Sequence, residues 1–146
     1  MTFRPEHAAA FKSLNLAWIR QHWDPEPADF QALDHPNKLL AAGGFIFIAE
    51  QNTQVVGTCA LLKMDSTSFE LAKMAVADGA KGLGIGQRLG ATVVAKAREL
   101  KATRVYLESN TVLEPAIALY RKLGFTPIDG PASPYARCNI QMELML

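Results

Sequence analysis

Three glycines at alternate positions mark the part of the sequence best suited to hold an anion. Gly82, Gly84 and Gly86 follow an apolar segment that is predicted to be a strand, residues 69–76, and precede apolar residues at helical spacing. Glycine lets a backbone bend sharply and approach a ligand closely. The first turn of a helix offers unpaired N–H groups and the positive end of the helix dipole. The segment therefore indicates a phosphate or pyrophosphate site.

The spacing of these glycines differs from two common nucleotide-binding motifs. A P-loop requires Gly-x-x-x-x-Gly-Lys-Ser/Thr, and although Gly79 and Gly84 have the glycine spacing, no lysine follows them. A dinucleotide fingerprint requires Gly-x-Gly-x-x-Gly, and its third glycine would fall at Gln87. Two interpretations of this segment remain. It is either a ligand-binding motif of the form Lys81-x-x-Gly84-x-Gly86 or a glycine-rich turn that binds no ligand.

That pattern resembles the acetyl-coenzyme A pyrophosphate signature of the GNAT acetyltransferase family, Arg/Gln-x-x-Gly-x-Gly/Ala, with Lys81 at the first position. Residues 116–125, Ala-Ile-Ala-Leu-Tyr-Arg-Lys-Leu-Gly-Phe, resemble the second block of the family, Leu-Tyr-x-Lys-x-Gly-Phe. The two motifs stand in the expected order and separation, and the resemblance covers residues 44–128. It implies an α+β, GNAT-like acyl-CoA acyltransferase fold, with a mixed, mostly antiparallel sheet flanked by helices, as a single domain over residues 1–146.

The resemblance implies transfer of an acetyl group from acetyl-coenzyme A, the cosubstrate, to a primary amine of a small molecule or peptide, which attacks directly in a ternary complex. Backbone groups of the strand would pair with the pantetheine arm, and N–H groups of the glycine turn would bind the pyrophosphate. Arg121, Lys122 or Arg88 would meet the outer phosphate, although a solvated helix face explains these charges equally well. The cofactor-binding residues expected are Met74, Ala75, Val76, Lys81, Gly82, Leu83, Gly84, Ile85, Gly86, Gln87, Asn110 and Lys122.

Two side chains are expected to carry the chemistry. Tyr120 matches the tyrosine of the family that hydrogen-bonds or protonates the coenzyme A sulfur, and a packed helix aromatic is the other interpretation. An alkylammonium, with a pKa of about 10.4, must lose a proton before it attacks. Glu70 is the preferred base and Glu108 the second candidate, with a solvated strand-end carboxylate as the alternative. In a regular strand Lys73 would point to the face opposite Glu70, and a bulge would change this direction.

The acceptor is less well defined by the sequence. In this fold the first helices and the last hairpin line the acceptor pocket, and the residues expected there are Trp18, Trp23, Glu26 and Tyr135. Glu26 and Asp29 would attract a cationic amine. Arg20, Arg137 or Lys73 would instead bind a carboxylate, as in an amino-acid acceptor. The sequence leaves both interpretations open.

Two further classes of function stay open. A non-catalytic acyl-coenzyme A sensor or interaction module would keep the turn at 81–86 but would need neither Tyr120 nor a base. The alternative within the enzyme class is an acyltransferase with another acyl donor or a hydroxyl acceptor.

The periodicity predicts the elements that position these residues. Helices are expected at 5–22, 28–33, 37–42, 87–100 and 114–123, and strands at 45–50, 55–64, 69–76, 104–109, 125–128 and 139–146. The first three strands form an antiparallel meander, with a bulge expected at Gly57. Strand 104–109 pairs in parallel with 69–76 through the intervening helix. The strand with which the family usually begins is reduced to residues 2–4 or is absent.

The composition is that of an ordinary globular chain. A net charge of +1 over 146 residues gives no basic excess for nucleic acid, and no apolar run reaches the ~20 residues of a membrane span. Without a signal-peptide pattern, a cytoplasmic location is expected. Cys59 and Cys138 are predicted to be buried free thiols, and the three histidines have no metal spacing, so no metal is expected. A homodimer is plausible because such sheets have exposed edges.

Overall fold

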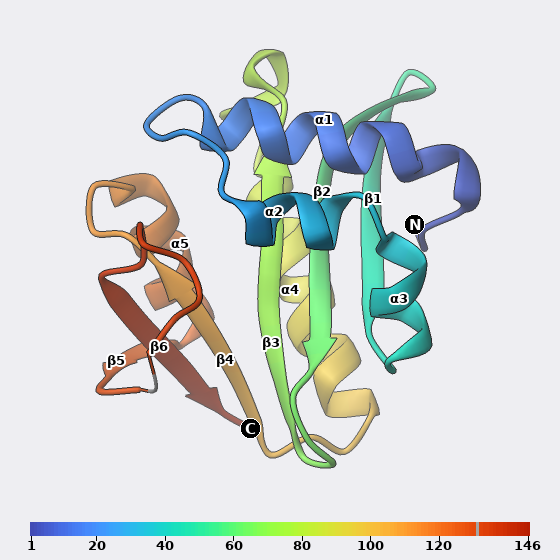
Figure 1. Ribbon diagram of the computed structural model, residues 1–146. Helices are drawn as coiled ribbons and strands as arrows, with labels where there is room; N and C mark the ends of the chain where they lie inside the picture. The colour runs from blue at the N-terminus through green and yellow to red at the C-terminus, as the bar shows by residue number, and fades with distance from the viewer. Residues whose placement is uncertain (131) are drawn as a thin grey trace.

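A six-stranded mixed sheet in the order β1-β2-β3-β4-β6-β5 forms the centre of the computed structural model, which describes residues 1–130 and 132–146 (Figure 1). Pro131, between the strands predicted at 125–128 and 139–146, lies outside the described residues. Only the β3–β4 pair is parallel. The prediction of an α+β fold with a mostly antiparallel sheet is confirmed. The strands are β1 Phe45–Gln51, β2 Gln54–Lys63, β3 Ser68–Val76, β4 Arg104–Ser109, β5 Thr126–Ile128 and β6 Ile140–Met145.

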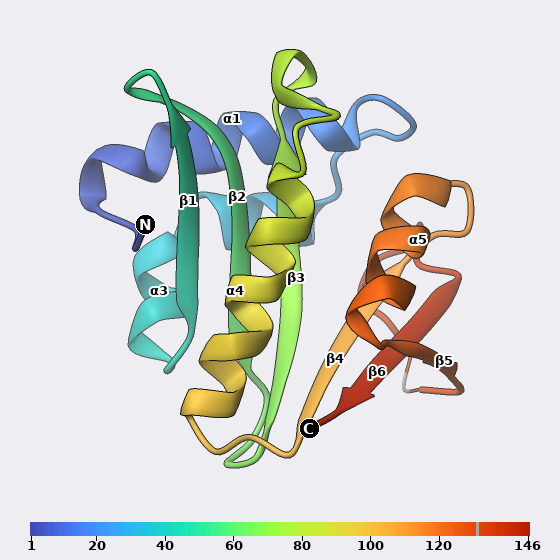
Figure 2. The ribbon, with the colours of Figure 1, turned by 180° about the vertical axis from the view of Figure 1, so that it is seen from behind.

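Helices cover both faces of the sheet. A 3-10 turn, η1 (Pro5–His7), leads into α1 (Ala8–Ile19), which lies with α2 (Pro27–Leu33) and α3 (Pro36–Ala41) on one face. Another 3-10 turn, η2 (Asp78–Ala80), precedes α4 (Ile85–Glu99), which covers the other face with α5 (Glu114–Leu123), as Figure 2 shows. Apolar clusters fill both interfaces. The first helix was predicted to reach residue 22, but the chain leaves it after Ile19 in a turn that precedes Pro25.

The edge of the sheet next to β1 carries only a trace of a further strand. Thr2 forms an isolated antiparallel bridge with Phe47, and the Phe3 N–H donates to the Ile46 carbonyl at 3.0 Å. Pro5 then starts η1, because its fixed φ suits the first turn of a helix. The expectation of a reduced first strand is confirmed.

Strands β3 and β4 pair over three residues and then diverge. Ser68–Glu70 pairs with Arg104–Tyr106, and beyond this point the two strands spread apart (Figure 1). The Ala77 N–H donates to the Val56 carbonyl of β2 at 2.8 Å. Backbone groups alternate in direction along an antiparallel pair, so those of Val76 point away from β2, toward the side that β4 has left. The parallel pairing was predicted, but its early end was not.

A β-bulge interrupts β3 at Lys73. Thr58 pairs with Ala75 and Ala60 with Ala72, so two residues of β3 oppose one of β2, and Lys73 has a φ of +55°. A bulge shifts the alternation of side chains between the two faces. A regular strand would have pointed Lys73 away from Glu70, but the bulge changes its direction, and Lys73 and Glu70 line the same cavity.

A second irregularity lies between β1 and β2. Ala49 pairs with Gly57 and Glu50 with Val55, which leaves Val56 as the extra residue. The bulge expected at Gly57 is thus displaced by one residue.

Within the described part of the chain, no helix combines the length and the apolar character needed to cross a bilayer.

Gly44 provides a stability test of the junction between α3 and β1. A Cβ at Gly44 would lie 2.9 Å from the carbonyl oxygens of Leu39 and Leu61, which are backbone atoms and cannot rotate away. We expect Gly44→Ala to lower the free energy of unfolding by about 1–3 kcal/mol, measured by urea denaturation. Gly79→Ala is the control, because a Cβ there meets nothing within 4 Å. Equal stability of the two variants would contradict this packing.

Candidate active site

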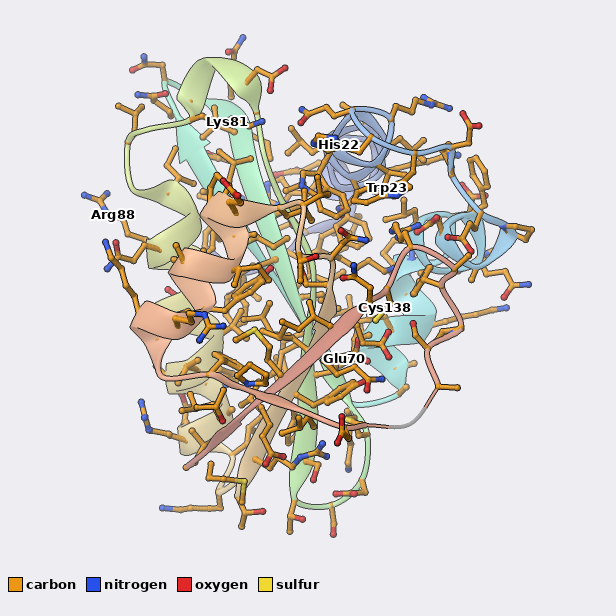
Figure 3. All side chains as sticks on the ribbon, turned by 90° about the vertical axis from the view of Figure 1, so that its left-hand side faces the viewer. His22, Trp23, Glu70, Lys81, Arg88 and Cys138 are labelled. Carbon is orange, nitrogen blue, oxygen red and sulfur yellow. The ribbon has the colours of Figure 1, made fainter. Side chains whose placement is uncertain are left out.

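A cavity of about 260 Å³ lies where β3 and β4 diverge, and several predicted site residues line it. Its walls come from α1, β3, β4, α5 and the segment that precedes β6. Figure 3 shows Trp23, in the turn after α1, above Cys138 and Glu70. The predicted site residues that line the cavity are Trp18, Trp23, Glu70, Met74, Asn110, Tyr120 and Tyr135.

The Glu70 carboxyl group has a pKa near neutral pH. Burial raises the pKa of Glu70 to about 7, and the neighbouring Glu108 carboxylate adds to this effect, while Lys73 opposes it. Glu108 accepts hydrogen bonds from the hydroxyl groups of Tyr106 and Ser133, both at 2.8 Å. Glu70 can therefore be ionised and accept a proton at neutral pH.

Tyr120 presents a protonated hydroxyl group to the same cavity. The side chain lies on α5, is 8% exposed and packs edge-on against Phe125 with ring centroids 6.1 Å apart. Burial raises the pKa of Tyr120 far above its usual value, and a smaller contribution comes from Cys59. The hydroxyl group therefore keeps its proton and can donate it in a hydrogen bond.

The glycine turn opens the first turn of α4. Gly82 and Gly84 have φ of +85° and +76°, and a Cβ at either would meet nothing within 4 Å, so the backbone angle rather than crowding requires glycine. Gly84 is the N-cap of α4 and makes no side-chain cap hydrogen bond. The helix was predicted to begin at Gln87 but begins at Ile85. The N–H groups of its first turn, from Ile85 to Gln87, carry the positive end of the dipole.

The basic side chains near this turn are exposed. Lys81 pairs with Asp78 at 2.9 Å and donates to Gln21 of the turn after α1 at 3.5 Å. Figure 3 shows Arg88 pointing outward from α4. Leu83 in the turn and Lys122 on α5 are also exposed.

Asn110 and Ala75, both predicted to bind the cofactor, are engaged within the protein. The amide group of Asn110 donates to the Arg137 carbonyl at 2.7 Å and accepts from the Val112 N–H at 2.9 Å. Ala75 is buried and opposes Thr58, so its backbone groups point toward β2. Val76 is therefore better placed than Ala75 to pair with the pantetheine through its backbone.

A salt-bridge cluster fastens the segment before β6 to α2. Arg137 binds both carboxylate oxygens of Asp29, at 2.8 and 2.6 Å, and one of Glu26 at 3.2 Å. The second Glu26 oxygen accepts from the Ala136 N–H at 3.0 Å. Glu26, predicted to bind the acceptor, thus holds the protein together and is not among the residues that line the cavity. We call this cluster of Arg137, Asp29 and Glu26 the clasp.

Asp29 is 0% exposed, and its ionised form depends on the clasp. Burial by itself would raise the pKa of Asp29, but the hydrogen bonds from Arg137 and from the Glu26 N–H, with the charges of Arg137 and Lys73, lower it overall. The Asp29 and Arg137 charges largely neutralise each other at the cavity wall.

Lys73 and Tyr135 meet inside the cavity. The Lys73 Nζ atom donates to the Tyr135 hydroxyl group at 2.5 Å and lies 4.5 Å from the centre of its ring. Arg137 also lies 4.5 Å from that ring. Burial raises the pKa of Tyr135 to about 12, with Asp29 adding to the effect. The direction of the Lys73 side chain depends on the bulge in β3. The sequence contains no signal that locates this bulge, so it did not determine on which face of the strand Lys73 lies.

The cysteines differ in burial. Cys59 is a buried free thiol as predicted, but Cys138 is half-buried at the cavity wall, so the prediction of burial is wrong for it. Among residues 1–130 and 132–146, no group of histidine, cysteine, aspartate or glutamate side chains is arranged to hold a metal ion.

The fold and the site together define a class of protein. A glycine turn at the start of a helix, a diverging parallel strand pair, and a carboxyl and a hydroxyl group at the divergence form the framework of an acyl-CoA acyltransferase fold. The model of the acetyltransferase (GNAT) family matches residues 9–125. The chain belongs to this family.

Curated relatives support the same assignment. The chain is 36% identical over 105 residues to the uncharacterized N-acetyltransferase YjgM of Escherichia coli, covering 68% of this chain and 63% of the relative. It is 33% identical over 97 residues to N-acetyltransferase 8F1 of Rattus norvegicus, covering 63% of this chain and 44% of that protein. The chain thus spans less than two thirds of the length of either relative.

Solved structures share the fold. A GNAT-family acetyltransferase from Staphylococcus aureus superposes with a TM-score of 0.89 at 22% identity, covering 98% of this chain and 95% of the other. The acetyltransferase yncA of Salmonella typhimurium, solved with acetyl-CoA, has a TM-score of 0.79 at 18% identity and covers 99% and 91%. The confirmed fold class therefore extends over nearly the whole chain.

The clasp can be tested by stability measurements. We expect Arg137→Leu to lower the free energy of unfolding at pH 7 by about 3 kcal/mol, because it leaves the buried Asp29 carboxylate without its partner. The matched control Arg98→Leu changes an exposed arginine of α4 and should cost less than about 0.5 kcal/mol.

The pH dependence of this loss has a defined sign. The lowered folded-state pKa of Asp29 stabilises the wild type above the unfolded pKa of about 3.9, and this stability is lost as pH falls through the folded value. In Arg137→Leu, burial raises the folded pKa, so protonation favours the folded variant. The difference between wild type and variant should therefore shrink between pH 7 and pH 4 in urea denaturation. A constant difference would contradict an ionised Asp29 in the clasp.

Proposed function

We propose that the chain is an acetyl-CoA-dependent N-acetyltransferase that acetylates a primary amine by direct attack in a ternary complex. The observation that carries the proposal is that Glu70 and Tyr120 line one cavity at the divergence of β3 and β4. The relatives named as N-acetyltransferases and the similar structure solved with acetyl-CoA support it.

The turn before α4 fits the pyrophosphate of acetyl-CoA. The space around Gly82 and Gly84 is open, and the N–H groups of Ile85, Gly86 and Gln87 lie at the positive end of the helix dipole. The backbone of Val76 points to the side of β3 from which β4 has departed, where an extended pantetheine arm can pair with it. Lys81 and Arg88 add positive charge nearby.

The residues of the cavity can supply each proton transfer that the reaction needs. The ammonium group of the acceptor loses one proton to Glu70, and its nitrogen then forms the amide bond as the thioester C–S bond breaks. The Val76 N–H, which points away from β2, would donate to the thioester oxygen, where negative charge develops. Tyr120 donates to the departing sulfur and regains a proton from the new amide nitrogen.

The role of Tyr120 distinguishes an enzyme from a binding module. We expect the wild type to bind acetyl-CoA with micromolar affinity in isothermal titration and not to bind NADH. Tyr120→Phe should leave this affinity unchanged but lower kcat by about a hundredfold. We would measure kcat as the rate of thiol release in the presence of a panel of amines. Unchanged turnover in Tyr120→Phe would contradict its catalytic role. Absence of any binding of acetyl-CoA to the wild type would contradict the proposed cosubstrate.

The raised pKa of Glu70 predicts the pH dependence of the reaction. Glu70 accepts protons only when ionised, so kcat/KM should rise with pH through an apparent pKa of about 7. Glu70→Gln should remove this rise and lower kcat/KM by about 10²–10⁴. In Glu108→Gln the like charge that raises the Glu70 pKa is gone, so the rise should move to lower pH. A profile that is identical in Glu70→Gln and the wild type would exclude Glu70 as the base.

A further inference from the structure

The Lys73 ammonium group in the candidate acceptor cavity forms no salt bridge within the described part of the chain, although the charges of Asp29, Glu70 and Glu108 are near enough to oppose the lowering of its pKa by burial. Among the residues that the structure describes, the contacts of the Lys73 ammonium group are the Tyr135 hydroxyl group at 2.5 Å and the Tyr135 ring, and neither carries a charge. An ammonium group has three N–H donors, of which Tyr135 takes one. Lys73 can therefore still form a charge-assisted hydrogen bond to an anion in the cavity.

The other charged groups at the cavity are already engaged or are needed for proton transfer. Arg137 and Asp29 bind each other through two hydrogen bonds, and Glu108 accepts from two hydroxyl groups. Glu70 is the proposed base. Arg20 is exposed and lies outside the cavity lining. Of the three cations that the sequence offers for binding a carboxylate, Lys73 is therefore the one that remains available.

We propose that the acetyl acceptor is a free α-amino acid, whose carboxylate binds Lys73 while its amino group faces Glu70. This proposal rests on the proposed function and names the substrate class of the same site. Lys73 and Glu70 line the same cavity because of the bulge in β3, so one small molecule can meet both. Burial lowers the pKa of Lys73 by removing water from its ammonium group, and a bound carboxylate would replace part of that lost solvation.

The shape of the cavity favours a free amino acid with an apolar or aromatic side chain. Trp18 and Trp23 line the cavity with their ring centroids 6.2 Å apart, next to Ile19. The volume of about 260 Å³ lies below the roughly 300–1,000 Å³ of pockets for drug-sized ligands. The amino terminus of a peptide would bring an amide in place of the α-carboxylate and would leave Lys73 without an anion.

The test compares acceptors that differ only at the carboxylate. We would measure kcat/KM by thiol release for phenylalanine, 2-phenylethylamine and phenylalanine amide, and for leucine and 3-methylbutylamine, with mass spectrometry of the products. We expect phenylalanine and leucine to exceed their decarboxylated amines by at least about tenfold. Phenylalanine amide controls for basicity: its amino group loses a proton more readily, so a preference for the carboxylate over the amide cannot come from an easier deprotonation.

Two lysine variants assign that preference to Lys73. Lys73→Met should reduce the ratio of phenylalanine to 2-phenylethylamine to about one, and Lys73→Arg should keep part of it. Lys101→Met is the matched control, because Lys101 also has a positive φ, +64° against +55°, but is exposed at the end of α4. It should keep the wild-type ratio.

The outcomes separate this proposal from the function on which it rests. Equal use of the amino acids and their decarboxylated amines by the wild type would overturn the proposal and leave the acetyltransferase activity in place. A folded Lys73→Met that keeps the wild-type ratio, or acetylation of Lys73 itself in place of the added amino acids, would also overturn it. Binding of acetyl-CoA without acetylation of any amine would overturn both. The wild-type comparison stands even where Lys73→Met does not fold.

Discussion

The early end of the β3–β4 pairing is the constraint on which the candidate site depends. Three residues of each strand pair, from Ser68 to Glu70 on β3, and then the strands separate. A parallel pair must be joined by a crossover, here through α4, whose first turn follows the end of β3. The divergence and the positive end of α4 therefore lie at the same end of the central strand. One extended ligand can reach both.

The opposite wall of the cavity is held in place by the salt bridges of the clasp. The segment before β6 has little secondary structure, and the clasp between Arg137, Asp29 and Glu26 attaches it to α2. A fully buried aspartate is stable as an anion only with such a partner, so the clasp joins segments more than 100 residues apart in the sequence. It also places Tyr135 beside Lys73.

The two walls of the cavity contribute different groups to it. β3 carries Glu70 and α5 carries Tyr120 at the position proposed for the thioester, and on the clasp side the charges of Asp29 and Arg137 pair with each other. Glu108 accepts hydrogen bonds from two hydroxyl groups, whereas Glu70 and Lys73, which differ in sign and lie on the same strand, form no salt bridge within the described part of the chain. An acceptor that carries both charges fits this arrangement, because each of its ends then meets a group of opposite charge.

Local patterns in the sequence were sufficient for the family, the fold class, the order of the elements, the position of the glycine turn before α4 and that of Tyr120 on α5, because each depends on residues close together in the chain. The inward position of Lys73, the engagement of Glu26 and Asn110, and the half-exposure of Cys138 were decided by the tertiary structure. A bulge is a mismatch in length between two paired strands, and a salt bridge joins distant segments. Neither leaves a periodic signal in a single sequence, so the direction of the Lys73 side chain and the pairing of Arg137 with Asp29 emerge only when the strands and helices are packed together.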